Sequence, residues 1–86
     1  NLHYKSFESQ FKSIFPDFNS SLLKLHPNLS PGDLRMCAYL KMNQNSNEIA
    51  LISGASIRTV ESQRYRLRKK MKISKEINLQ TYLLKI

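Results

Sequence analysis

The chain has 86 residues, enough for one domain with a modest hydrophobic core. Fourteen Lys and Arg against six Asp and Glu give a formal charge of +8, which favours a polyanionic partner such as nucleic acid. A single cysteine excludes an internal disulfide framework and fits the reducing cytoplasm. The sequence shows no signal peptide and no run of roughly 20 apolar residues, so we expect no membrane contact.

Apolar stripes predict two helices in the first 28 residues. The first stripe recurs at i, i+4, i+7 and i+8 and is closed by Pro16; it consists of Phe7, Phe11, Ile14 and Phe15. The second helix begins near Pro16 or Asp17 and ends at His26-Pro27. Its expected core residues are Phe18, Leu22, Leu23 and Leu25. We expect residues 1–28 to form an N-terminal extension that packs on the rest of the domain.

A third helix is predicted from Pro31 to about Met42. Ser30 caps it, proline takes the first helical position, and Asp33 lies in the first turn. Its expected core residues are Leu34, Cys37, Ala38 and Leu40. We interpret Cys37 as a small buried hydrophobe without a redox or metal role. Because His3 and His26 have no ligand partners at metal-binding spacing, we expect neither a metal site nor a cofactor.

Two further helices meet at a short break that contains Gly54. The first begins at Asn45 or Ser46, with Asn45 and Glu48 spaced for a capping box and with Ile49 and Ile52 facing the core. Across this break, a small residue in the first helix, a glycine in the turn and a branched apolar residue in the second helix stand four and then six positions apart. They are Ala50, Gly54 and Val60. This spacing is typical of a helix-turn-helix, in which two helices cross closely after a tight turn.

The second of these helices is capped by Ser56 and is expected over residues 57 to about 72. At 100° per residue its packing face carries Val60, Arg64, Leu67 and Met71. Arg64 is anomalous on this face, and we expect its charged head to lie at the edge, within reach of a phosphate. The opposite face carries Arg58, Glu61, Ser62, Tyr65 and Lys69. Basic residues crowd the stretch from 58 to 75, where the only acid is Glu61: Arg58, Arg64, Arg66, Arg68, Lys69, Lys70, Lys72 and Lys75.

A last helix is predicted from Asn78 to Ile86. Its apolar stripe consists of Leu79, Tyr82, Leu83 and Ile86. Part of that stripe must pack on the domain's own core, because an isolated helix this short is not stable alone.

From Leu29 onward the chain resembles the LuxR-type (GerE-type) helix-turn-helix domain. The resemblance is carried by Leu29-Ser30-Pro31-Gly32-Asp33, Ser46-Asn47-Glu48-Ile49-Ala50, Ala55-Ser56-Ile57-Arg58-Thr59-Val60 and Lys69-Lys70-Met71. The Phe-rich stretch at 7–27 and the run at 60–70 resemble, more narrowly, C-terminal domains of Bacteroidetes sensor and regulator proteins. Because the chain also begins without Met, we expect it to be the C-terminal part of a longer protein.

The resemblance implies an all-α fold: a LuxR/GerE-type effector domain at 29–86, of the winged-helix-like superfamily, with two extra helices at 1–28. It implies a bacterial transcription regulator whose helix 57–72 enters the major groove of double-stranded DNA. By this resemblance Glu61, Ser62 and Tyr65 contact bases, and Arg58, Thr59 and Lys69 contact phosphates. Their charge and position add Arg66 and Arg68 to the phosphate set. The family often forms homodimers through its last helix, here through Leu79, Tyr82, Leu83 and Ile86.

Three departures from the family pattern prevent a transfer of base specificity. Glu61 stands where a lysine is common, and a carboxylate would accept a hydrogen bond from a cytosine amino group. Gln63 replaces a common histidine, and Arg64 replaces an aliphatic residue.

Two other functions share the same helical pattern. A sigma-factor region-4-like module would also dock on RNA polymerase, and a helix-turn-helix fold can serve protein–protein interaction without DNA. An enzyme is not expected, because the chain has no catalytic Ser/His/Asp or Cys/His set and no Gly-rich phosphate loop.

Overall fold

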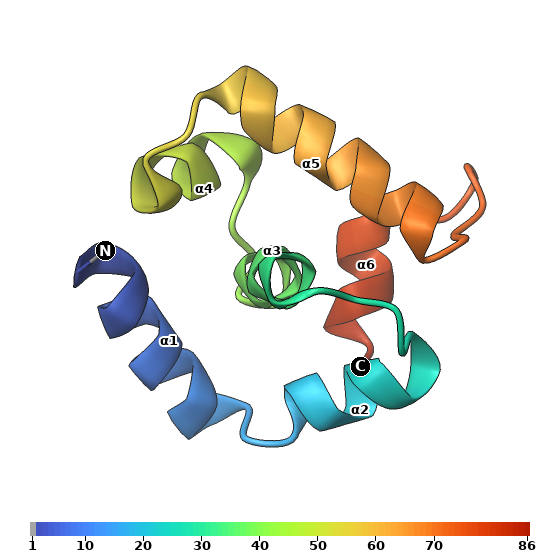
Figure 1. The fold of residues 1–86 in the computed structure, drawn as a ribbon, viewed down its shortest axis with the longest axis horizontal. Helices are drawn as coiled ribbons and strands as arrows, with labels where there is room; N and C mark the ends of the chain where they lie inside the picture. Colours follow the sequence, from blue (N-terminus) through green and yellow to red (C-terminus); the bar gives the residue numbers. More distant parts are fainter. Residues whose placement is uncertain (1) are drawn as a thin grey trace.

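Six helices account for most of the part of the chain that the computed structural model describes, residues 2–86 with side chains from Lys5 onward. They are α1 (Leu2–Ile14), α2 (Phe18–Leu25), α3 (Pro31–Lys41), α4 (Ser46–Ser53), α5 (Ile57–Lys70) and α6 (Leu79–Leu84). Residues 2–86 contain no strand, which confirms the all-α prediction. Figure 1 shows α3 end-on in the centre with the other five helices around it.

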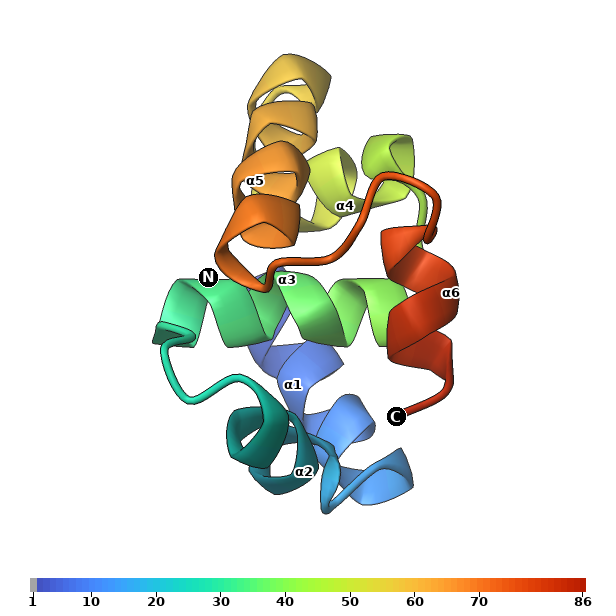
Figure 2. The ribbon, with the colours of Figure 1, turned by 90° about the vertical axis from the view of Figure 1, so that its right-hand side faces the viewer.

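The C-terminal half of the central helix α3 is covered on all sides. In Figure 2 it crosses the middle of the fold, with α4 and α5 above it, α1 and α2 below it, and α6 against its C-terminal end. Five consecutive residues of α3 are buried: Met36, Cys37, Ala38, Tyr39 and Leu40. The sequence pattern predicted a single apolar face, so it missed Met36 and Tyr39, and Leu34 is only half-buried. A helix surrounded by neighbours buries residues at every angle.

The predicted starts of α3, α4 and α5 are confirmed, whereas α2 begins at Phe18, after the predicted Pro16 or Asp17. Ser30 and Asp33 form a reciprocal capping box, in which the Asp33 backbone N–H donates to the Ser30 hydroxyl at 3.1 Å. Asn45 and Glu48 form a second box with both bonds at 2.8 Å. Gly54 adopts a left-handed conformation (φ 77°), which lets α4 end and the chain turn into α5 within three residues.

Two helix ends use a left-handed residue that is not glycine. Asn43 (φ 62°) follows α3, and Lys72 (φ 58°) follows α5. After α5 the Ile73 N–H donates to the Arg68 carbonyl at 3.2 Å, the long bond of a Schellman motif. The motif ends α5 at Lys70, two residues before the predicted end.

The N-terminal extension contributes to the same core as the rest of the chain. Phe11, Phe18 and Leu22 are buried in one cluster with residues of α3, α4, α5 and α6. The rings of Phe11 and Phe18 meet edge to face at 5.3 Å between centroids. The prediction that Ile14, Leu23 and Leu25 face the core is wrong, because these side chains are 52%, 36% and 59% exposed. Only one side of α1 and α2 is covered, and these three residues point away from it.

The contact between α4 and α5 gives a first testable prediction. Ala50 is half-buried and packs against the core beside α5. Ala50→Glu would place a charge there, which we expect to cost about 2 kcal/mol and to lower the thermal midpoint by about 10 °C. Leu51→Glu is the matched control, because Leu51 is 82% exposed and its replacement should leave the midpoint unchanged. Equal midpoints for the two variants would contradict close packing of α4 on α5.

Candidate nucleic-acid interface

The two faces of α5 have opposite environments. Val60, Leu67 and Met71 are buried on the inner face, as their spacing predicted. The outer face carries exposed side chains along its whole length, namely Arg58, Thr59, Glu61, Ser62, Tyr65, Arg66 and Lys69. Figure 1 shows α5 at the edge of the fold, with α3 and α4 on its inner side and none of the described helices beyond it. The outer face is therefore accessible to a large partner.

Three predicted base-contacting residues lie within about one helical turn on this face. Glu61, Ser62 and Tyr65 are all exposed, and the Tyr65 ring is 59% exposed. Lys69 Nζ lies 5.0 Å from the centroid of that ring, in cation–π geometry. The hydrogen bond with the Tyr65 side chain raises the pKa of Lys69 further above neutral pH. In the part of the chain described, Glu61 has no ion-pair partner within 4.0 Å.

The Arg64 side chain forms a hydrogen bond within the protein. Its Nη1 donates to the Ser46 hydroxyl at 3.0 Å, and Ser46 is the first residue of α4 and is buried. This bond joins α5 to the start of α4 and satisfies a buried polar group. The bond engages one terminal nitrogen of the guanidinium, and the phosphate contact expected of the Arg64 head stays a prediction.

Arg68 is also engaged within the protein. Its Nη1 donates to the carbonyl of Ser74 at 2.8 Å and to the carbonyl of Ile77 at 2.6 Å. Both acceptors belong to the segment between α5 and α6. Its predicted phosphate contact would compete with these two bonds.

Lys70 joins the end of α5 to the start of α3. Its Nζ lies 2.6 Å from the Asp33 carboxylate, which already belongs to the α3 capping box. Burial raises the pKa of Asp33, but the bonds from Lys70 and Ser30 outweigh it, and the net change lowers that pKa. The sequence offered no signal for this pair, whose members stand 37 positions apart.

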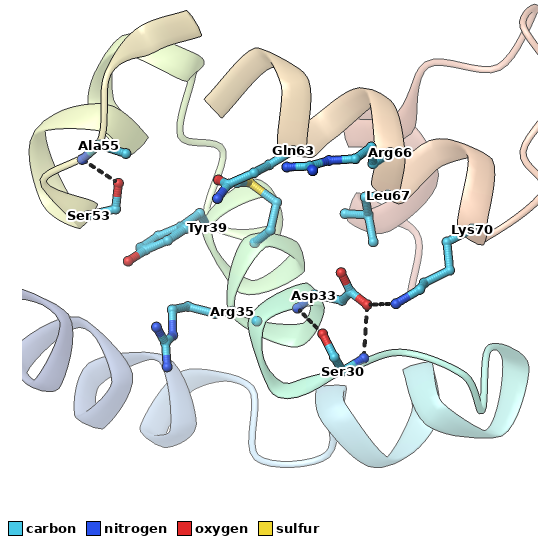
Figure 3. A pocket seen from close by; sticks show the side chains of 12 residues that line it. Ser30, Asp33, Arg35, Tyr39, Ser53, Ala55, Gln63, Arg66, Leu67 and Lys70 are labelled. Carbon is cyan, nitrogen blue, oxygen red and sulfur yellow. Dashed lines mark hydrogen bonds and ion pairs between the residues drawn. The ribbon is translucent and has the colours of Figure 1, made fainter. Parts of the chain in front are cut away.

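A pocket of about 520 Å³ lies between α3, the turn before α5, and α5 itself. Figure 3 shows Gln63 and Arg66 on the α5 side of the pocket, with the Lys70–Asp33 pair at one end. Ser53 and Ala55 line it at the other end. Arg66 is thus the one predicted phosphate-contacting residue that lines this pocket.

The predicted pairing residues of α6 are largely used by the domain itself. Leu79 and Leu83 are buried, and Tyr82 and Ile86 are half-buried. The Tyr82 hydroxyl lies 2.8 Å from His26 Nε2, which connects α6 to the end of α2. A two-fold contact on α6 would therefore depend on Leu84, which is 44% exposed, and on the exposed groups beside it. Pairing through this helix stays a prediction.

The other chemistry-bearing residues show no assembled site within the described range. Burial raises the pKa of the Cys37 thiol to about 12, so it remains protonated and unreactive at neutral pH. No three His, Cys, Asp or Glu side chains gather there as a metal site would require, and the prediction for His3 lies outside the described side chains. None of the described helices is long and apolar enough to cross a membrane.

Comparisons of the chain with protein-family models, with curated proteins and with solved structures found no match. The resemblance to LuxR-type domains therefore depends on the sequence motifs alone.

Proposed function

We propose that this chain is the sequence-specific, double-stranded DNA-binding domain of a bacterial transcription regulator, with α5 as its recognition helix. The observation that carries the proposal is the exposed outer face of α5, where cations alternate with side chains whose polar groups can form hydrogen bonds to bases. An α-helix fits the major groove of B-DNA, and its N-terminal residues then meet base edges. The LuxR-type motifs are independent support for the same docking.

Base reading in this proposal belongs to Glu61, Ser62 and Tyr65. The Glu61 carboxylate has no protein partner among the described residues and can accept from a cytosine N4 amino group. Ser62 and Tyr65 each supply a hydroxyl that can donate or accept.

Phosphate binding in this proposal belongs to Arg58, Thr59, Arg66 and Lys69. Arg58 and Thr59 lie in the first turn of α5, where the helix dipole also favours an anion. Arg66 and Lys69 extend the positive charge toward the C-terminal end. Each contact releases counterions from the duplex, so affinity should fall steeply as salt rises.

Lys69→Ala tests this electrostatic component. We expect the variant to weaken binding to every duplex alike and to reduce the log–log salt slope by about one unit, measured by fluorescence anisotropy. Lys24→Ala is the matched control, because Lys24 is exposed on α2, on the other side of α3. An unchanged slope for Lys69→Ala would remove this lysine from the phosphate set.

A protein–protein interaction module is the second candidate function. Leu51 is 82% exposed on α4 and Ile57 is 50% exposed at the start of α5, and exposed apolar side chains favour a protein partner such as RNA polymerase. A sigma-factor region-4-like domain would use these apolar side chains to dock on RNA polymerase and the outer face of α5 to bind DNA. Competition between duplexes of different sequence separates the DNA-binding domain from an interaction module without a nucleic-acid role, because the basic charge alone gives binding that is equal for all duplexes.

A homodimer through α6 would place two recognition helices about 34 Å apart on a pseudo-palindromic site. The buried positions of Leu79 and Leu83 restrict such a contact to the outer side of α6.

A further inference from the structure

The segment between α5 and α6 is held at both of its ends. Met71 precedes it and Leu79 follows it, and both side chains are buried in the core. Lys72 and Lys75 are exposed between these two anchors. Figures 1 and 2 show the segment passing beside the C-terminal end of α5 before it reaches α6. We call residues 72–78 the α5–α6 loop.

Hydrogen bonds fix the shape of the α5–α6 loop. Arg68 Nη1 donates to the carbonyls of Ser74 and Ile77, which joins the last turn of α5 to two points of the loop. Within the loop the Ile77 N–H donates to the Ser74 carbonyl at 3.1 Å, and the Ser74 hydroxyl bonds to the Glu76 carboxylate. A loop that is ordered before binding loses less conformational entropy when a partner binds.

The charge and backbone of the loop favour an anionic partner. Lys72 and Lys75 outnumber the single acid, Glu76, whose carboxylate already accepts from Ser74. Lys72 adopts a left-handed conformation (φ 58°), which costs about 1 kcal/mol for a residue with a Cβ. The conformation belongs to the Schellman motif that ends α5, and it fixes the backbone from which the exposed Lys72 side chain extends.

We infer that the α5–α6 loop is a second DNA-backbone-binding element, in which Lys72 and Lys75 contact phosphates and Arg68 is the residue that positions them. The inference rests on the proposed function, because it assumes that α5 enters the major groove. It also gives Arg68 a different role from direct phosphate binding: the two carbonyl bonds hold the loop against α5.

Two lysine variants test the contacts. Lys72→Asn removes the charge while keeping a residue that tolerates the left-handed conformation, and Lys75→Gln removes the second charge. Each should reduce the log–log salt slope of binding to a fluorescent duplex of mixed sequence by about one unit, and the double variant by about two. Lys24→Gln on α2 is the control and should keep the wild-type slope. Comparison of each variant's thermal midpoint with that of the wild type checks that the variant is folded.

Arg68→Lys tests the positioning role. It keeps the positive charge, but the flexible lysine side chain does not hold its ammonium in the fixed position and orientation that the planar guanidinium gives Nη1. We expect a reduced slope in the otherwise wild-type chain and no further reduction in the Lys72→Asn/Lys75→Gln background. Exchange of the Ile77 amide hydrogen should also become faster. A direct Arg68–phosphate contact would instead leave the slope nearly unchanged by Arg68→Lys in both backgrounds, because lysine keeps the charge.

The outcomes separate this inference from the proposed function. If wild type binds the duplex with a steep salt dependence and both lysine variants keep the wild-type slope, the second element is excluded and α5 remains the recognition helix. If wild type shows no salt-dependent binding to any duplex, the proposed function itself fails. Reduced slopes in both lysine variants, with a background-dependent Arg68→Lys effect, support the loop as a second element.

Discussion

Leu22→Ala is expected to destabilise the whole domain by about 2–5 kcal/mol, a large part of the total stability of a chain of this size. Leu22 is fully buried on α2 and belongs to the same core as Leu40 and Leu83. Removing its side chain leaves a cavity in this shared core. Because this core runs through both parts of the chain, we expect a single unfolding transition at a midpoint lower by 10 °C or more, on the order of 4–8 °C per kcal/mol.

Leu23→Ala is the matched control for that experiment. Leu23 is the next residue of α2 and is 36% exposed, so its truncation should cost about 1 kcal/mol or less. Chemical denaturation followed by circular dichroism measures both variants. A loss at Leu22 no larger than the loss at Leu23 would show that residues 1–28 do not share the core of residues 29–86.

Glu61→Gln is expected to change affinity in opposite directions for specific and nonspecific DNA. The variant removes a negative charge from the basic face of α5, so binding to unrelated duplexes should become tighter. The amide no longer matches the cytosine amino group and instead suits adenine, so preference at one base pair should shift by about 1–3 kcal/mol. Competition between duplexes that differ at this position measures the shift, and Ser20→Ala on α2 is an exposed, uncharged control. An identical change for all duplexes would exclude base reading by Glu61.

Local signals in the sequence predicted the helix starts and the turn, because each depends on a few neighbouring residues. Ser30 with Asp33, and Asn45 with Glu48, form their capping boxes within one turn, and Gly54 relieves strain at its own position. The buried face of α5 was also predictable, because periodicity along one helix determines it once a core exists.

Interactions between distant segments could not be predicted in the same way. The Lys70–Asp33 ion pair, the Arg64–Ser46 bond and the two Arg68 bonds each depend on how helices and loops meet in space. These contacts decide which cations on α5 remain available to a partner.

The exposure of individual apolar residues depends on the same spatial arrangement. Ile14 and Leu25 continue apolar stripes in the sequence, yet more than half of each residue's surface stays exposed. Tyr39 was not predicted as a core residue because the sequence does not show that α3 is surrounded.

The most direct test of the central claim, that α5 reads double-stranded DNA, is selection of the chain on a library of random duplexes, followed by titration of the enriched sequence. The account predicts one short enriched motif with a cytosine whose preference depends on Glu61, and affinity that falls steeply with salt. A library that stays random after repeated rounds, with no salt-dependent binding of wild type to any duplex, would contradict it.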